Sequence, residues 1–96
     1  MGKKYFESKI GKKFTVKLDT DVTTDLELIS VDPLKKNEGV EKGREEPFSL
    51  VFSGAKDKHL SDNTYTMAVE NEEERNIFIS AFAEDEKGIL YDAVFN

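Results

Sequence analysis

Two short segments constrain the fold of this chain more than any other feature. Apolar and polar residues alternate in residues 47–54 (PFSLVFSG), and residues 88–96 (GILYDAVFN) carry apolar side chains on both faces. Alternation with a period of two is typical of a half-buried β-strand, because successive side chains point to opposite faces of a sheet. The two segments therefore predict a β protein, and neither contains a group of reactive side chains.

The size and composition of the chain predict one small domain. It has 96 residues, of which 38% are hydrophobic and none is cysteine. A chain of this length supports a single core, so we expect one domain over residues 1–96. Neither a run of roughly 18 apolar residues nor the apolar stretch of a secretory signal is visible in the sequence. We expect a cytoplasmic protein that does not bind membranes.

The net charge of −6 is unevenly distributed. Residues 1–17 hold six lysines and one acid, a balance of +5, whereas residues 18–96 hold eight bases and nineteen acids, a balance of −11. An acidic body argues against nucleic acid as a ligand, since phosphate contacts need a basic surface. The basic segment could dock on an anionic partner or on the acidic body of a second copy, although a solvated charged face is the simpler interpretation.

The spacing of apolar residues predicts one short helix and six strands. Residues 3–10 place Phe6 and Ile10 at helical spacing, and Gly11 can end that helix. A one-residue shift of the apolar phase at Ile29 predicts a β-bulge. Residues 34–46 are charged and without a period, so we expect a mobile loop there. Strands are expected around residues 13–18, 26–31, 47–53, 64–69, 77–82 and 89–95.

Six strands with mostly short connections predict an all-β fold, built as a small antiparallel barrel or sandwich. The last two strands are apolar on both faces, so one face must be covered by the N-terminal segment or by a partner. An edge strand could in addition pair with a strand of the partner. The side chains of this candidate interaction face are Phe78, Phe82, Leu90 and Val94.

His59 is the only histidine, and it lies close in sequence to Asp57, Ser61 and Asp62. These are the residue types of a hydrolase triad, but near neighbours on a polar loop rarely converge as a triad requires. We therefore interpret His59 as an exposed loop residue and predict no catalytic group.

Three aspartates in one connection could suggest a calcium site. Asp19, Asp21 and Asp25 are close together, but the sixth and twelfth positions of an EF-hand loop starting at Asp19 are Thr24 and Ser30. An EF-hand needs glycine and glutamate there. The aspartates are better interpreted as turn residues, and we predict no metal site and no cofactor.

Three motifs occur in a fixed order along the chain. They are a G-x-x-F opening from Gly11 to Phe14, the central PFSLVFSG, and a terminal YDAVFN in which Asp92 stands where glutamate is usual. In this order the chain resembles a family of short bacterial proteins of unknown function, over nearly its whole length. The resemblance implies no activity, cofactor or catalytic residue, and it suggests an association with phage-tail-like assemblies. The connection at residues 54–63 departs from the tighter Gly-Pro loop of that pattern.

These observations together predict a non-catalytic protein-interaction or assembly module, whose partner is another protein or a second copy. One alternative is a small-ligand-binding barrel with a mouth lined by Phe48, Phe52, Tyr65 and Tyr91. A second alternative is a small hydrolase built around His59. Because neither alternative has a visible site, the interaction module is the favoured hypothesis.

Overall fold

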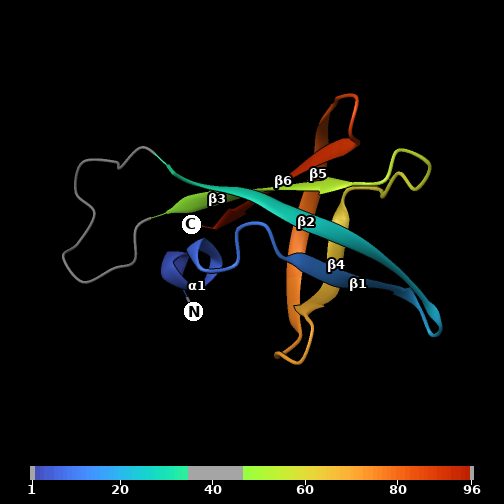
Figure 1. The fold of residues 1–96 in the computed structure, drawn as a ribbon, viewed down its shortest axis with the longest axis horizontal. Helices are drawn as coiled ribbons and strands as arrows, with labels where there is room; N and C mark the ends of the chain where they lie inside the picture. The colour runs from blue at the N-terminus through green and yellow to red at the C-terminus, as the bar shows by residue number, and fades with distance from the viewer. Residues whose placement is uncertain (1, 35–46, 96) are drawn as a thin grey trace.

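The structure is a computed structural model that describes residues 2–34 and 47–95. The strands are all antiparallel to their neighbours and close into a barrel in the order β1-β2-β3-β6-β5-β4 (Figure 1). This confirms the all-β prediction and selects the barrel over the sandwich. The loop predicted at 34–46 lies, apart from its first residue, outside the described residues. The elements are α1 (Lys3–Glu7), β1 (Lys13–Asp19), β2 (Val22–Pro33), β3 (Phe48–Gly54), β4 (Asn63–Val69), β5 (Arg75–Glu84) and β6 (Ile89–Phe95).

The core forms because every strand turns its alternate apolar side chains into the barrel. In β3 each residue predicted to face inward is fully buried, and the residues between them are half-buried. Burial of one such large apolar side chain stabilises the fold by roughly 1.5–3 kcal/mol. The buried side chains of the described residues are Phe6, Phe14, Val16, Leu26, Leu28, Phe48, Leu50, Phe52, Leu60, Met67, Ile77, Ile79, Ile89, Tyr91 and Ala93.

Residues from outside the strands fill the two ends of the barrel. At the end nearer α1, the Phe6 ring lies with its centroid 5.3 Å from that of Phe95 and 5.9 Å from that of Phe48. Toward the other end, Leu60 is buried, and its backbone N–H donates a 3.0 Å hydrogen bond to the Tyr91 hydroxyl. The buried tyrosine hydroxyl thus has a partner, and the loop before β4 is held against the barrel.

The N-terminal helix is shorter than the sequence predicted. It ends at Glu7, and Ile10 is 47% exposed instead of packing beside Phe6. The chain leaves the helix because it bonds to β2: the Gly11 N–H donates to the Leu28 carbonyl at 2.7 Å, and the Leu28 N–H donates to the Lys12 carbonyl at 3.0 Å. Gly11 has a φ of +87°, which glycine adopts at little cost. The turn therefore directs Ile10 to the surface.

Three β-bulges interrupt the strand registers. The predicted shift in β2 is confirmed between Leu28 and Ser30, and further shifts occur in β1 and β5. Bulges increase the local twist, which a small closed barrel needs. The extra residue at each bulge is a large hydrophobic residue that points outward, and these are Leu18, Ile29 and Phe82.

Candidate interaction surface

The four residues predicted as an interaction face lie on the outer side of β5 and β6. Phe78, Phe82 and Val94 are 56%, 54% and 53% exposed, and Leu90 is half-buried. The N-terminal segment does not cover them, because Phe6 turns into the end of the barrel instead. We call this surface the β5–β6 face, and within the described chain it presents its aromatic rings to solvent.

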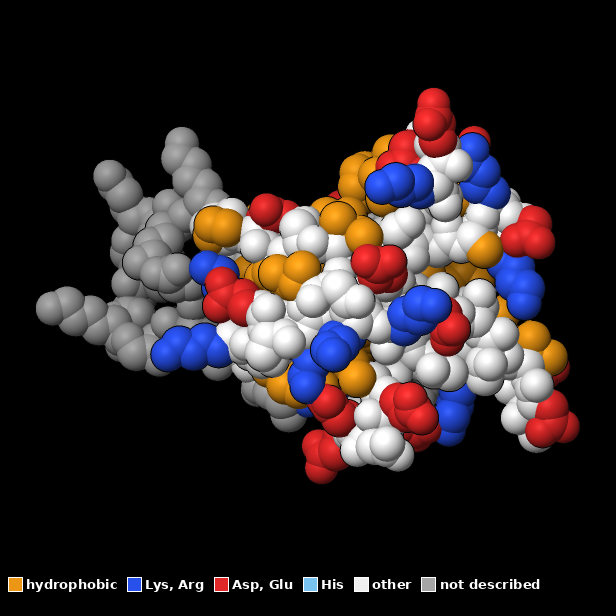
Figure 2. Space-filling model, viewed as in Figure 1, with side chains coloured by type: hydrophobic (Ala, Val, Ile, Leu, Met, Phe, Trp, Pro, Cys, Tyr) orange, Lys and Arg blue, Asp and Glu red, His pale blue; other side chains and the backbone are white. Residues whose placement is uncertain are grey.

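A bulge lies at one of the two aromatic side chains of the β5–β6 face. Ala81 pairs with Tyr91 and Ala83 with Leu90, which leaves Phe82 between them without a partner on β6. Strand alternation gives Phe82 the same outward phase as Phe78 and Ser80, and at the bulge its side chain has no cross-strand neighbour on β6. Hydrophobic side chains gather beside the β5–β6 hairpin at the top of the view in Figure 2. The fold therefore exposes this ring without breaking the barrel.

A polar row crosses the β5–β6 face between its two aromatic side chains. Ser80 on β5 pairs with Asp92 on β6, and the Ser80 hydroxyl donates a 3.0 Å hydrogen bond to the Asp62 carboxylate. The backbone N–H of Ala81 donates to the same carboxylate at 3.2 Å. Two carboxylates thus lie beside exposed phenylalanines, so the face combines apolar area with negative charge.

The closed barrel corrects one expected mode of binding. We expected that an edge strand could pair with a strand of a partner, but each of the six described strands already has two hydrogen-bonded neighbours. A closed barrel removes sheet edges. Contacts at the β5–β6 face must therefore be made by side chains.

Two of the residues close to His59 in the sequence are hydrogen-bonded to neighbouring strands. His59 is exposed in the loop before β4, as predicted. The Ser61 carbonyl accepts a 2.8 Å hydrogen bond from the Tyr65 hydroxyl. The Ser61 hydroxyl lies 3.2 Å from the Tyr65 hydroxyl oxygen. The Asp62 carboxylate is bonded to β5. Ser61 and Asp62, two of the three residues named beside His59, thus form their hydrogen bonds with β4 and β5.

The three aspartates of the first hairpin do not gather around a metal position. Asp19 accepts a 2.8 Å hydrogen bond from the Thr20 N–H, as turn aspartates do, and Asp25 accepts one from the Thr15 hydroxyl at 3.4 Å. Over residues 2–34 and 47–95, no group of three histidine, cysteine or acidic side chains is arranged to hold a metal ion. The turn interpretation therefore accounts for Asp19.

The proposed ligand-binding mouth is occupied by packing. Phe48, Phe52 and Tyr91 are at most 2% exposed and belong to the core, and the Phe52 ring meets the Phe14 ring edge-on at 5.3 Å. Tyr65 lies at the periphery of this core, with its hydroxyl directed to the loop before β4. These rings fill the interior and so act in stability.

A polar cluster that the sequence did not predict attaches α1 to the turn between β4 and β5. The Glu72 carboxylate accepts a hydrogen bond from the Tyr5 hydroxyl, and its other oxygen lies 2.6 Å from the Lys9 ammonium. The Arg75 guanidinium lies 4.0 Å from the centroid of the Tyr5 ring. These partners are more than sixty residues apart, so no local spacing reveals them. The one signal in the sequence is the contrast between a basic N-terminus and an acidic body.

The cluster shifts the pKa values of its members. The hydrogen bond from Lys9, followed by that from Tyr5, holds the pKa of Glu72 below its ordinary value of 4.5. The hydrogen bond to Glu72 raises the pKa of Lys9, and burial followed by the hydrogen bond to Glu72 raises the pKa of Tyr5. The lowered carboxyl pKa stabilises the fold above pH 4.5, and this stabilisation is lost as the pH falls through the folded value. The raised pKa values of Lys9 and Tyr5 have the opposite pH dependence. Their stabilisation is present at lower pH and is lost as the pH rises through the folded values in the alkaline range.

Replacing Glu72 with glutamine should therefore change how stability depends on pH. We expect Glu72→Gln to be less stable than the wild type at about pH 7, and this difference to shrink as the pH is lowered to about 3, because protonation of the wild-type carboxylate removes the stabilisation. Urea unfolding at the two pH values measures it. Glu73→Gln, at the exposed neighbouring position, is the matched control and should follow the wild type. A Glu72→Gln difference that is equal at both pH values would contradict this assignment.

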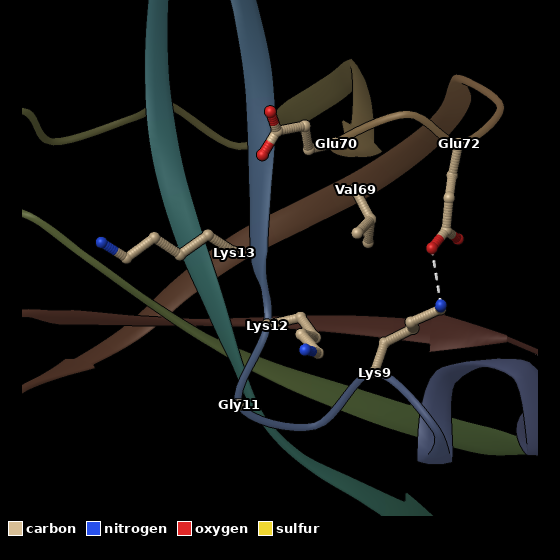
Figure 3. Close-up of a pocket in the computed structure, with 7 residues that line it drawn as sticks. All are labelled: Lys9, Gly11, Lys12, Lys13, Val69, Glu70 and Glu72. Atoms are coloured by element: carbon tan, nitrogen blue, oxygen red, sulfur yellow. Dashed lines mark hydrogen bonds and ion pairs between the residues drawn. The ribbon is translucent and has the colours of Figure 1, made fainter.

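A hollow with a volume of about 570 Å³ lies on the surface between the segment that leads from α1 into β1 and the end of β4. In Figure 3, Val69 projects between the two glutamates, Lys9 reaches Glu72, and Lys12 lies on the opposite wall. We call it the α1–β1 hollow. It is lined by Lys9, Gly11, Lys12, Lys13, Val69, Glu70 and Glu72.

Comparison with known proteins identifies a family. The family model described as "Domain of unknown function (DUF6916)" matches residues 1–95. No curated protein and no solved structure matches the chain. In the part of the chain that the structure describes, no helix has the length and apolar character to cross a membrane. The function must therefore be argued from the surface itself.

Proposed function

The chain belongs to the family described as Domain of unknown function (DUF6916), and we propose that it is a non-catalytic module that binds another protein through the β5–β6 face. The membership agrees with the predicted resemblance to an uncharacterised family over nearly the whole chain. The observation that carries the proposal is that Phe78, Phe82 and Val94 are all more than half exposed on two neighbouring strands.

The chemistry of the face favours a protein as the ligand. Phenylalanine is enriched in the buried centres of protein interfaces, and a few such side chains supply most of the binding energy. Burying one of them completely is worth roughly 1.5–3 kcal/mol. The carboxylates of Asp62 and Asp92 beside the rings supply polar contacts that fix orientation. The face is convex barrel surface, which suits a complementary macromolecule.

The acidic charge and the resemblance extend the proposal to the biological setting. A net charge of −6 supports a partner other than nucleic acid. The cysteine-free sequence is compatible with the reducing cytoplasm, where we place the protein. The motif order supports a bacterial protein with a structural role in a phage-tail-like assembly. This is the specific form of the interaction module, and the genes beside the coding sequence would test it.

A charge placed on the β5–β6 face should abolish partner binding. Val94→Asp introduces a carboxylate at a 53% exposed position of the face. We expect immobilised wild type to retain a protein from native cell extract at low and moderate salt, and Val94→Asp to retain at least about tenfold less, since a tenfold loss needs only 1.4 kcal/mol. Quantitative mass spectrometry of the retained proteins is the measurement.

Val22 provides a matched control, because it is 49% exposed on β2 and lies outside the face. Val22→Asp adds the same charge to the same residue type, so it should retain the partner as the wild type does. Equal loss in the two variants would show an effect of net charge alone and would overturn the proposal. A partner released from the wild type at moderate salt would point instead to the lysines of the N-terminus, whose exposed contacts are screened beyond roughly 8–10 Å.

A further inference from the structure

We propose that the partner of the β5–β6 face is a second copy of this chain, which receives the face in its α1–β1 hollow. This inference rests on the proposed function, because it names the partner of the same face. In this contact the exposed phenylalanines of one copy insert into the α1–β1 hollow of the other copy. The inference rests on the room that the hollow offers to a side chain and on the charges of the two surfaces.

The hollow offers room for a projecting side chain. The two phenylalanines project from the outer side of β5, one of them at a bulge. The hollow has room for side chains, at about 570 Å³, and Val69 lines it between charged walls (Figure 3). Ile10, which lies between two lining residues in the sequence, is a 47% exposed apolar residue. An aromatic ring entering this space could contact Val69.

The charges match as well. The β5–β6 face carries the carboxylates of Asp62 and Asp92 beside its rings. On the hollow, Lys12 and Lys13 are exposed, and neither forms an ion pair with any residue in the described ranges. By contrast, Lys9 and Lys17 are already paired with Glu72 and Glu74.

The lysines of the hollow can interact with the phenylalanine rings as well as with the carboxylates. An ammonium group within about 6 Å of a phenylalanine ring is attracted to its face. The lining holds three lysines against two glutamates, Glu70 and Glu72. Glu72 is already engaged by Lys9 and Tyr5, which lowers the repulsion that an incoming carboxylate meets. The hollow therefore suits an acidic aromatic surface better than a basic one.

The arrangement of the two surfaces determines the kind of assembly. The β5–β6 hairpin and the segment joining α1 to β1 lie on different sides of the barrel (Figure 1). Figure 2 shows basic side chains over the latter segment. A contact between two different surfaces is heterologous, so each copy can bind one neighbour at each side. Such a contact gives a ring if the rotation closes and an open filament if it does not.

Complementary variants test the inference. Phe82→Ser removes a projecting ring from the face without adding charge and leaves the hollow intact. The double substitution Lys12→Glu and Lys13→Glu disables the hollow and leaves the face intact. We expect the wild type to exceed the mass of a dimer as its concentration rises in sedimentation velocity, and each variant alone to stay monomeric. Mixed in equal amounts, the two variants should form a 1:1 dimer that does not grow further.

Each remaining outcome overturns the inference. A wild type that stays monomeric at millimolar concentration, or a mixture that stays monomeric while both variants retain the wild-type circular dichroism spectrum, excludes the contact. A double lysine variant that still dimerises would show a symmetric face-to-face contact instead. If self-association is absent but Val94→Asp still loses a protein from extract, the second copy is excluded and the proposed function stands. If neither experiment responds, both fail.

Discussion

Phe6→Ala is expected to lower the free energy of unfolding by about 3–5 kcal/mol, the usual cost of removing a fully buried phenylalanine. The Phe6 side chain is 1% exposed and contacts the rings of Phe14, Phe48 and Phe95. It is also the one buried residue of α1. A helix of five residues has no stability of its own in water, so α1 depends on this ring for its position. A domain of this size has a total stability of about 5–15 kcal/mol, of which this loss is a large part.

Urea unfolding and amide hydrogen exchange measure the two consequences of Phe6→Ala separately. We expect faster exchange at Gly11 and Leu28, whose N–H groups donate the hydrogen bonds that join the α1 connection to β2. Glu7→Ala changes an exposed residue of the same helix and should stay within about 0.5 kcal/mol of the wild type. A Phe6→Ala variant that loses less than about 1 kcal/mol, with exchange unchanged, would show that the ring does not hold the end of the barrel.

The strands and their inward-facing residues were predictable because burial of one sheet face requires apolar residues at every second position. Phe48, Leu50 and Phe52 alternate with residues that tolerate the outer face, and the structure buries all three. The bulge at Ile29 was predictable for the same reason, since it shifts the phase of the apolar letters. The bulge at Phe82 left no such trace, because the alanines on both sides suit either face. Periodicity thus reports a bulge only where the flanking residues prefer one face.

The candidate surface was predictable in its residues but not in its surroundings. An apolar outer face on β5 and β6 follows from the alternation, but whether α1 covers it depends on where the connection at Gly11 turns. The Glu72 cluster and the α1–β1 hollow arise from segments more than fifty residues apart that the barrel brings together. No local pattern encodes such contacts. They depend on strand order, which the sequence left open between barrel and sandwich.

Gly88→Ala is expected to destabilise the protein by about 3 kcal/mol, at the upper end of what overpacking usually costs. A Cβ atom at this position would lie far inside contact distance of the Gly54 carbonyl oxygen, 3.2 Å from that carbonyl carbon and 3.3 Å from the Ser53 hydroxyl. The obstacle is backbone in the β3–β6 ladder, where Gly54 pairs with Ile89, so it cannot turn aside as a side chain could. Strand separation is the one relief available, and it breaks ladder hydrogen bonds.

The same substitution should also disturb the β5–β6 hairpin. The Asp85 carboxylate accepts hydrogen bonds from the Lys87 and Gly88 N–H groups, at 2.8 and 3.0 Å, and the Asp85 N–H donates to the Gly88 carbonyl. Displacing Gly88 would strain this turn, which sets the register of Leu90 beside the bulge at Phe82. We therefore expect Gly88→Ala to weaken binding at the β5–β6 face even where the barrel remains folded.

Gly11→Ala separates the effect of crowding from that of backbone conformation. Gly11 has a φ of +87°, but no atom lies within 4 Å of its would-be Cβ, so alanine there should cost about 1–2 kcal/mol through backbone strain alone. Thermal and urea unfolding of the two variants, compared with the wild type, give the two costs. Because the Gly88 cost arises from contact with β3, it should exceed the Gly11 cost by a factor of about two. Equal costs, or a milder effect at Gly88, would mean that β3 and β6 do not approach as closely at Gly54 as the structure has them.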